Sequence, residues 1–261
     1  MGLSQTLRFI LSHPMNRGQP FSSLARFAKW QIHSRLKDEV IFNWVDGAKL
    51  AVRRGMTGAT GNIYCGLHEY VDMSFVLDNL EPGDLFVDIG ANVGSYTVLA
   101  SKVCGAASIA VEPDPGTADF LRRNIEVNEI KGTVRVIESA LGAQQGVISF
   151  TVGRDTTNRV AKAEDREVRQ VPVRTLDDVL KGESPKIIKV DVEGFEAEVF
   201  KGAARTLADP ALKAIITETL DTDVLEILTK AGFRRGYYNP ERGEVAQSSS
   251  FASNNSLMLR E

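Results

Sequence analysis

The sequence is poor in cysteine and has no long apolar run. Cys65 and Cys104 are the only cysteines among its 261 residues, so a disulfide framework is excluded and a reduced, cytoplasmic protein is favoured. The sequence has no uninterrupted apolar stretch of about 18 residues, so no transmembrane segment is predicted. The N-terminus also lacks the pattern of a secretory signal. The net charge of −3 gives no general attraction to nucleic acid. We therefore expect a small-molecule or glycan ligand and no nucleic-acid partner; the oligomeric state has no signature in the sequence.

The length fits one α/β domain with an N-terminal extension. We place the extension at residues 1–65 and the main domain at residues 66–261. The first 40 residues are locally basic, and residues 21–30 have the apolar spacing of an amphipathic helix. Two interpretations stay open for this helix: it covers the core, or it contacts a membrane surface or an acidic partner. Four glycines between Arg53 and Gly66 predict a loop that passes close to a ligand.

Short apolar runs alternate with helical patterns over most of the chain. This alternation predicts a parallel sheet with crossover helices on both of its faces. Strands are expected at 40–52, 85–90, 107–112, 134–138, 146–152, 168–173, 186–191, 214–218 and, as a closing edge strand, 256–260. Helices are expected at 69–80, 95–104, 117–128, 195–207 and 223–231. The polar segment 153–165 is expected to be a hairpin tip or loop that, with the glycine-rich segment, faces the acceptor.

A glycine-containing turn follows the strand at 85–90, in the sequence Phe86-Val-Asp-Ile-Gly-Ala-Asn-Val-Gly-Ser95. Ligands bind at such strand-to-helix turns in open α/β sheets, and we expect Gly90 and Gly94 to leave volume for a ligand. Asn92 and Ser95 stand where the dinucleotide fingerprint needs glycine. The Asp88 carboxylate would repel a pyrophosphate but suits the ammonium and sulfonium of S-adenosylmethionine.

Further candidate residues follow the next two strands. Glu112 ends the second strand about 20 residues after the glycine turn, where an acidic side chain can bind both hydroxyls of a ribose. Glu138 and Ser139 follow the third strand, where an adenine edge would lie. Together with Asp88 and the glycine turn, these residues predict an adenosine-containing ligand.

A second acidic cluster occurs in Lys189-Val-Asp-Val-Glu-Gly-Phe-Glu196. Asp191 ends its strand and is expected to face the same crevice as Asp88, next to the methyl donor. Candidate bases for the proton of an acceptor hydroxyl are Asp191, Glu193, Glu218 and His68, of which His68 has the most suitable unperturbed pKa. Asp191 could instead ligate a metal ion together with Glu218 and Asp221, but the spacing is not that of the known magnesium-dependent enzymes, and we predict no metal.

Three segments together resemble the FkbM-type methyltransferases: Phe86 to Ala100, Val111-Glu-Pro-Asp-Pro115 and Ile188 to Glu196. The resemblance implies a Rossmann-like class I methyltransferase sheet of seven strands, mostly parallel, with the last strand antiparallel. It also implies S-adenosylmethionine as cofactor and methyl transfer to a hydroxyl of a sugar or secondary metabolite. By position it assigns donor binding to Asp88, Gly90, Asn92, Gly94 and Glu112.

Two other functions compete with this interpretation. The chain could bind S-adenosylmethionine without turnover, as a regulatory module, or it could be a nucleotide-dependent oxidoreductase. The second alternative lacks the glycines that Asn92 and Ser95 replace. Transfer to nitrogen is disfavoured because Asp191-Val-Glu-Gly stands where amino-methylating enzymes have an N-P-P-[YF] loop.

Overall fold

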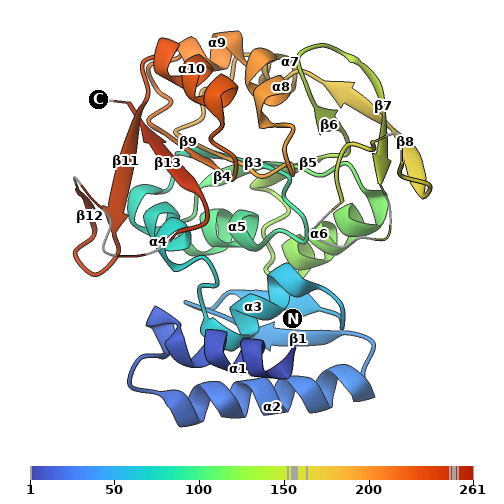
Figure 1. The fold of residues 1–261 in the computed structure, drawn as a ribbon, viewed down its shortest axis with the longest axis vertical. Coiled ribbons are helices and arrows are strands. Elements are labelled where there is room, and N and C mark those ends of the chain that lie inside the picture. The colour runs from blue at the N-terminus through green and yellow to red at the C-terminus, as the bar shows by residue number, and fades with distance from the viewer. Residues whose placement is uncertain are drawn as a thin grey trace.

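The structure is a computed structural model that describes residues 2–151, 153, 158–162, 164–246, 248, 251 and 253–260. Its centre is an eight-stranded sheet (Figure 1). In sheet order the strands are β12 (Glu244–Ala246), β11 (Arg234–Asn239), β13 (Ser256–Leu259), β10 (Ala214–Thr217), β9 (Ile187–Val190), β3 (Leu85–Ile89), β4 (Ala107–Val111) and β5 (Val134–Ile137). The five strands from β10 to β5 are parallel. This arrangement confirms the predicted Rossmann-like α/β class.

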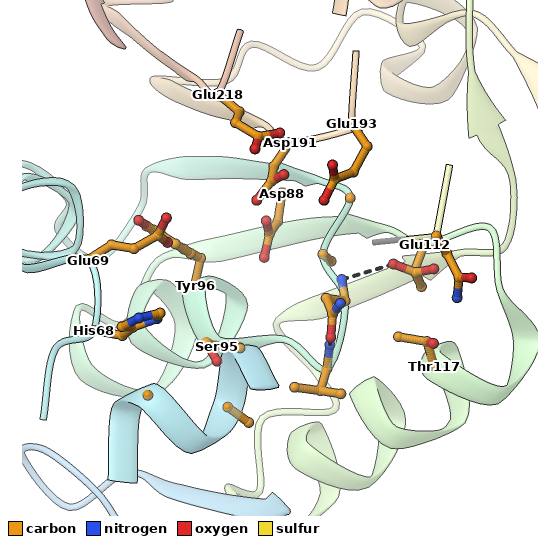
Figure 2. Close-up of a pocket in the computed structure, with 18 of the residues that line it drawn as sticks. His68, Glu69, Asp88, Ser95, Tyr96, Glu112, Thr117, Asp191, Glu193 and Glu218 are labelled. Carbon is orange, nitrogen blue, oxygen red and sulfur yellow. Dashed lines mark hydrogen bonds between the residues drawn. The ribbon is translucent and has the colours of Figure 1, made fainter. Parts of the chain in front are cut away.

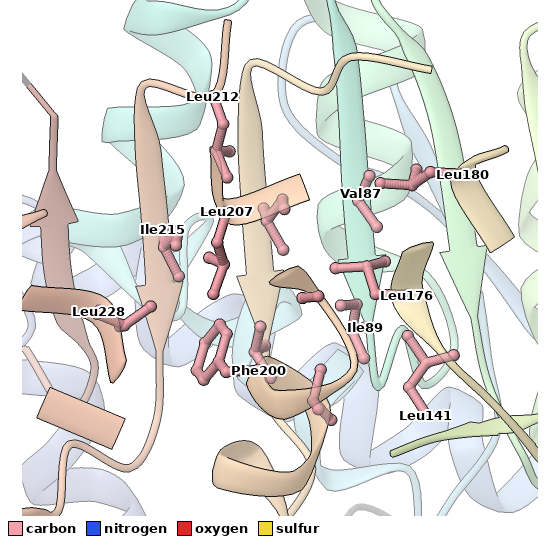
Figure 3. Close-up of a cluster of buried hydrophobic side chains, with 14 of the residues drawn as sticks. Val87, Ile89, Leu141, Leu176, Leu180, Phe200, Leu207, Leu212, Ile215 and Leu228 are labelled. Carbon is pink, nitrogen blue, oxygen red and sulfur yellow. The ribbon is translucent and has the colours of Figure 1, made fainter. Parts of the chain in front are cut away.

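Helices cover both faces of the sheet, as Figure 1 shows. On one face lie α7 (Leu176–Leu180), α8 (Glu196–Lys201), α9 (Ala204–Ala208) and α10 (Thr222–Lys230). On the other lie α4 (Tyr70–Asn79), α5 (Ser95–Val98), the π-helical turn Leu99–Val103 and α6 (Pro115–Val127). Successive strand residues point to opposite faces, so Val87 lies in the cluster with α7 to α10 (Figure 3), while Phe86 packs against α4 on the other face. Burial on both faces explains why these strands read as continuous apolar runs.

Two details of the expected sheet are wrong. Strand β13 lies between β10 and β11 and runs antiparallel to both, so it is not an edge strand. Gly236 of β11 packs against Leu259 of β13, since a Cβ atom there would lie 2.4 Å from Leu259 Cδ1. The sheet has eight strands instead of seven because β12 forms a hairpin with β11.

The expected helix at 195–207 is divided into α8 and α9. Gly202 lies between the two helices, and a Cβ atom there would come within 2.1 Å of the Gly142 carbonyl oxygen. The chain therefore passes so close to Gly142 that a regular helix with side chains does not fit. Likewise, the expected strand at 40–52 is a hairpin of β1 (Val40–Asn43) and β2 (Lys49–Val52).

A small second sheet extends the molecule beside β5. It contains β6 (Ala140–Leu141), β8 (Val168–Arg174) and β7 (Gly146–Thr151), in that order. Strands β7 and β8 are antiparallel, as the sequence suggested for 146–152 and 168–173. Most of the segment between 152 and 157 lies outside the described residues.

The N-terminal segment packs below the sheet in Figure 1. It comprises α1 (Leu3–Ser12), a 3-10 turn at Pro14–Asn16, α2 (Pro20–Leu36), the β1–β2 hairpin and α3 (Thr57–Cys65). The glycine-rich segment is therefore mainly helical, and the expected loop is wrong. Gly61 packs against the ring of His68, since a Cβ atom at Gly61 would lie 2.5 Å from Cγ of His68. Among the described residues, no helix is both long and apolar enough to cross a membrane.

Candidate active site

A cavity of about 740 Å³ opens at the carboxyl ends of β3, β4, β9 and β10. Its walls are the turn after β3, the residues that follow β4, β5 and β9, and the N-terminal helices α1, α2 and α3. Figure 2 shows Glu112 on one side of this cavity and the carboxylates of Asp191, Glu193 and Glu218 gathered on another. Its volume is in the usual range for a small-molecule site. The strand-end residues predicted from the sequence therefore do meet in one place.

Gly90 and Gly94 are required by contacts within the protein. A Cβ atom at Gly90 would lie 1.8 Å from the backbone oxygen of Asp191, and one at Gly94 would lie 2.4 Å from Leu121 Cδ1. Both residues also have positive φ angles, +74° and +87°. The expectation that a side chain at these positions would occupy ligand volume is therefore wrong. Gly90 still lines the cavity through its backbone, whereas Gly94 does not.

Asp88 is buried at the carboxyl end of β3 and lines the cavity. Its Oδ2 accepts hydrogen bonds from the backbone N–H and the hydroxyl of Thr97, at 3.0 and 2.7 Å. Burial raises the pKa of Asp88, while the Lys189 ammonium and the Thr97 bonds act in the opposite direction. One carboxylate oxygen thus holds the first turn of the following helix in place.

Glu112 lies one strand away and also lines the cavity. Its Oε2 accepts from the Asn92 N–H and its Oε1 from the Asp114 N–H, both at 2.9 Å. Asn92 has a left-handed backbone, φ +51°, which turns its N–H toward Glu112. Burial raises the pKa of Glu112 to about 7. Each carboxylate oxygen keeps a free lone pair that a ligand hydroxyl can use.

Ser139 and Glu138 have different surroundings. Ser139 lines the cavity, and its buried hydroxyl has no hydrogen-bond partner among the described residues. Glu138 does not line the cavity; it pairs with Arg122 on the surface. The prediction of a ligand contact is therefore wrong for Glu138, because adjacent residues of an extended chain point in opposite directions.

Asp191, Glu193 and Glu218 form a carboxylate cluster in the cavity, with oxygen atoms within 4.8 Å of one another. Asp191 Oδ2 accepts from Lys189 Nζ at 2.7 Å. Burial opposes ionisation of Asp191, but the Lys189 ammonium outweighs it and lowers the pKa. Burial and the neighbouring Asp191 charge raise the pKa of Glu218 to about 7, and burial likewise raises that of Glu193. Near neutral pH, Asp191 is therefore ionised and Glu218 is partly protonated.

Asp221 lies apart from this cluster. Its Oδ1 accepts from the Val224 N–H at 2.9 Å and caps the start of α10. The set that could ligate a divalent cation is thus Asp191, Glu193 and Glu218, a different set from the one considered from the sequence.

His68 lines the cavity beside Glu69 and Tyr96, as Figure 2 shows. Its backbone N–H donates to Oδ1 of Asn62 at 2.9 Å, and its ring packs on Gly61 and edge-on against Phe9. Burial lowers the pKa of His68, so the imidazole is neutral at pH 7. A neutral imidazole can accept a proton.

Two cavity residues were missed in the sequence. Lys189 is buried within β9, with its ammonium 4.9 Å from the centre of the Tyr96 ring, and it is the counterion of Asp191. A lysine inside an otherwise apolar strand was the available signal. Asn62 is buried on α3, and its side chain donates to Ser95 Oγ at 3.1 Å. It joins the N-terminal segment to the glycine turn.

The comparison with known families agrees with this geometry. The model of the methyltransferase FkbM domain matches residues 88–235, from the end of β3 to β11. The chain belongs to the FkbM methyltransferase family. The matched region contains the turn after β3, Glu112 and the carboxylate cluster, whereas His68 and the N-terminal helices precede it.

Curated relatives are similar to part of this chain. The hexuronic acid methyltransferase AglP of Haloferax volcanii is 32% identical over 135 residues, which are 51% of this chain and 55% of AglP. Methyltransferase 1 of Beauveria bassiana is 33% identical over 150 residues, 46% of this chain and 59% of that protein. The chain thus spans little more than half the length of these relatives. A crystal structure of methyltransferase FkbM from Methylobacillus flagellatus has a TM-score of 0.47 at 19% identity, over 67% of this chain and 43% of that one.

Proposed function

We propose that the protein is an S-adenosylmethionine-dependent methyltransferase that acts on a hydroxyl group of a sugar or secondary metabolite. The observation that carries this proposal is the shared cavity, in which Glu112 and the turn after β3 face the carboxylate cluster after β9 and β10. Membership of the FkbM family supports the reaction type. The name of AglP supports a sugar acceptor.

The residues present fit the donor. The two free lone pairs of Glu112 suit the hydroxyls of a ribose, and the unpartnered hydroxyl of Ser139 suits a polar edge of adenine. The carboxylate of Asp88 suits the ammonium and sulfonium groups at the methionine end of the donor. When bound, the donor would supply an activated methyl group.

The chain's own task is then to align the acceptor and remove its proton. As the bond forms between the acceptor oxygen and the methyl carbon, the methyl–sulfur bond breaks and the hydroxyl proton passes to a base. We assign this base to the pair of Asp191 and Glu218, with Glu193 beside it, because Asp191 is ionised at neutral pH and the pKa of Glu218 is raised to about 7. His68 is the alternative base, since its neutral ring lines the same cavity.

The wall opposite the donor turn would hold the acceptor. It includes Phe9 of α1, Phe27 of α2 and Tyr64 of α3, whose aromatic rings can pack on the apolar face of a sugar. Asn158 and Val160 from the polar segment 153–165 also line the cavity.

Calorimetric titration of the purified protein with S-adenosylhomocysteine, with NAD as control, tests the donor. Saturable binding of S-adenosylhomocysteine alone is expected, and binding of NAD instead would favour the oxidoreductase. Transfer of labelled methyl from S-adenosylmethionine to methyl glucoside and methyl glucuronide then tests turnover. Donor binding without transfer to these or other hydroxyl compounds would leave the regulatory module as the better interpretation.

A further inference from the structure

Helix α2 exposes an apolar ridge on its outer side. Phe21, Ala25, Ala28, Ile32 and Leu36 follow one another at intervals of three or four residues and therefore share one face of the helix. All five are exposed, and the largest three are 88% (Phe21), 58% (Ile32) and 76% (Leu36) exposed. A ridge of this kind on one element differs from the single exposed apolar residues that any protein surface carries.

The opposite side of the same helix already has its partners. Trp30, Ser23 and Ser34 are buried, and Phe27 packs against Tyr64 of α3. The helix lies along the edge of the molecule most remote from the sheet, as Figure 1 shows. Its ridge is therefore not needed for the contact that holds α2 on the protein.

Basic residues flank the ridge, and residues 1–37 contain no acidic residue. Residues 1–37 contain six Lys and Arg residues and no Asp or Glu, although the chain has a net charge of −3. Lys29 and Arg35 are exposed at positions on either side of the ridge, and Lys37 follows the end of the helix. Within the described part of the chain, none of these three pairs with a carboxylate. The segment presents apolar area and positive charge together.

We propose that α2 docks the protein on the surface of an anionic lipid bilayer. The ridge would enter the interface between headgroups and acyl chains, and Lys29 and Arg35 would contact lipid phosphates, as in interfacial amphipathic helices. A bilayer fits better than an acidic protein because the ridge is a line of exposed apolar side chains along the outermost helix, with exposed cations beside it. The cavity wall formed by Phe27 and Gln31 on the same helix would then lie close to the bilayer.

Flotation of the full chain with vesicles tests this surface. Vesicles of phosphatidylcholine alone are compared with vesicles that also contain phosphatidylglycerol, at low and high salt. We expect binding to the anionic vesicles only, weakening as salt rises. The double variant Lys29→Glu/Arg35→Glu should lose about tenfold or more in affinity, since one basic residue near an anionic surface is worth about fivefold. The double variant Phe21→Ser/Ile32→Ser should also lose about tenfold or more, since it removes apolar area that would be buried in the interface.

Control variants carry changes of the same kind elsewhere on the surface. Val147→Ser/Val245→Ser removes two other exposed apolar side chains, 69% and 55% exposed, and Lys213→Glu reverses an exposed charge. These variants should bind anionic vesicles like the unmodified protein. Circular dichroism and S-adenosylhomocysteine binding would verify that every variant is folded.

Three results would overturn the proposal. The first is equal binding to neutral and anionic vesicles, or binding that both α2 variants retain. The second is a dimer in sedimentation experiments that Phe21→Ser/Ile32→Ser dissociates, because the ridge would then belong to a contact between two copies. The third is salt-sensitive binding to polyglutamate without binding to vesicles, which would assign the surface to an acidic protein.

Discussion

The backbone oxygen of Asp191 lies where Gly90 would carry its side chain, 1.8 Å from the position of a Cβ atom. Gly90→Ala should therefore lower the free energy of unfolding of the ligand-free protein by about 2 kcal/mol or more, since the positive φ adds strain to the overlap. Chemical unfolding measures this. Gly132→Ala is the control, because nothing lies within 4 Å of a Cβ atom there and its φ is not positive. Equal stability of the two variants would mean that the backbone at Asp191 moves freely.

Removal of the charge at Glu112 should weaken donor binding. Hydrogen bonds to a charged group contribute about 1.5–3 kcal/mol, so Glu112→Gln should weaken S-adenosylhomocysteine binding by about tenfold or more. Glu138→Gln, at the end of the neighbouring strand but outside the cavity, is the matched control and should bind normally. Calorimetry distinguishes the two. Equal losses in both variants would restore Glu138 as a ligand contact.

The raised pKa of Glu112 predicts a pH dependence. Because its folded value is about 7, the carboxylate form increases as pH rises through 7, and donor affinity should increase with it. The stability of the ligand-free protein should change in the opposite direction. A raised pKa contributes stability that is present below the unfolded value of 4.5 and is lost as pH rises to about 7. Glu112→Gln should remove both effects, and a variant that keeps them would assign the titration to another group.

Ser139→Ala should separate ligand binding from folding. The buried hydroxyl has no partner in the described protein, so its removal should leave the unfolding free energy unchanged or slightly higher. Affinity for S-adenosylhomocysteine should fall by about fivefold, the value of one neutral hydrogen bond of about 1 kcal/mol. Unchanged affinity would show that the hydroxyl does not contact the donor.

The pH profile of turnover should identify the base. If the Asp191–Glu218 pair accepts the proton, kcat/KM for the acceptor at saturating S-adenosylmethionine should rise with pH around 7, where Glu218 ionises, and Glu218→Gln should remove that rise. If His68 is the base, the rise should occur below its ordinary value of 6.5, because burial lowers its pKa. His68→Gln serves as the reciprocal variant. A midpoint near 7 that survives Glu218→Gln would contradict the assignment to the pair.

Lys189→Met should destabilise the protein at neutral pH by about 3–5 kcal/mol, because it leaves Asp88 and Asp191 without their buried counterion. Lys189 lowers the pKa of Asp191, and this stabilisation is present above the unfolded value of 3.8 and is lost as pH falls. The difference between variant and unmodified protein should accordingly shrink in acid. Urea unfolding at several pH values measures it, with exposed Lys213→Met as control.

The parallel strands could be predicted because burial on both faces produces continuous apolar runs, which are visible in the sequence of each strand alone. Strand β11 could not be predicted, since its sequence begins with Arg234 and Arg235 and contains no apolar run. The interior position of β13 depends on its pairing with β10 as well as with β11, and β10 lies far away in the sequence. The helix α3 was mistaken for a loop because glycine has low helix propensity, while the His68 ring that requires Gly61 becomes visible only in the fold.

The site was predictable where topology alone decides the position. Carboxyl ends of parallel strands meet at one edge, so Asp88, Glu112 and Asp191 were expected to share a crevice. Side-chain direction is a finer property, and it separates Ser139 from Glu138 one residue apart. Lys189 has a meaning only once the carboxylates around it are known, because a buried ammonium needs a counterion that the strand itself does not show.

The shared hydrogen bonds of Asn62 bear on how this scaffold can diversify. Its side chain binds both Ser95 of the glycine turn and the backbone of His68, so α3 connects the turn after β3 to the segment that carries His68. Leu3, Thr6 and Phe9 of α1 also line the cavity. New acceptor preferences should therefore evolve through exchanges on α1, whereas changes around Asn62 would impair use of every acceptor alike.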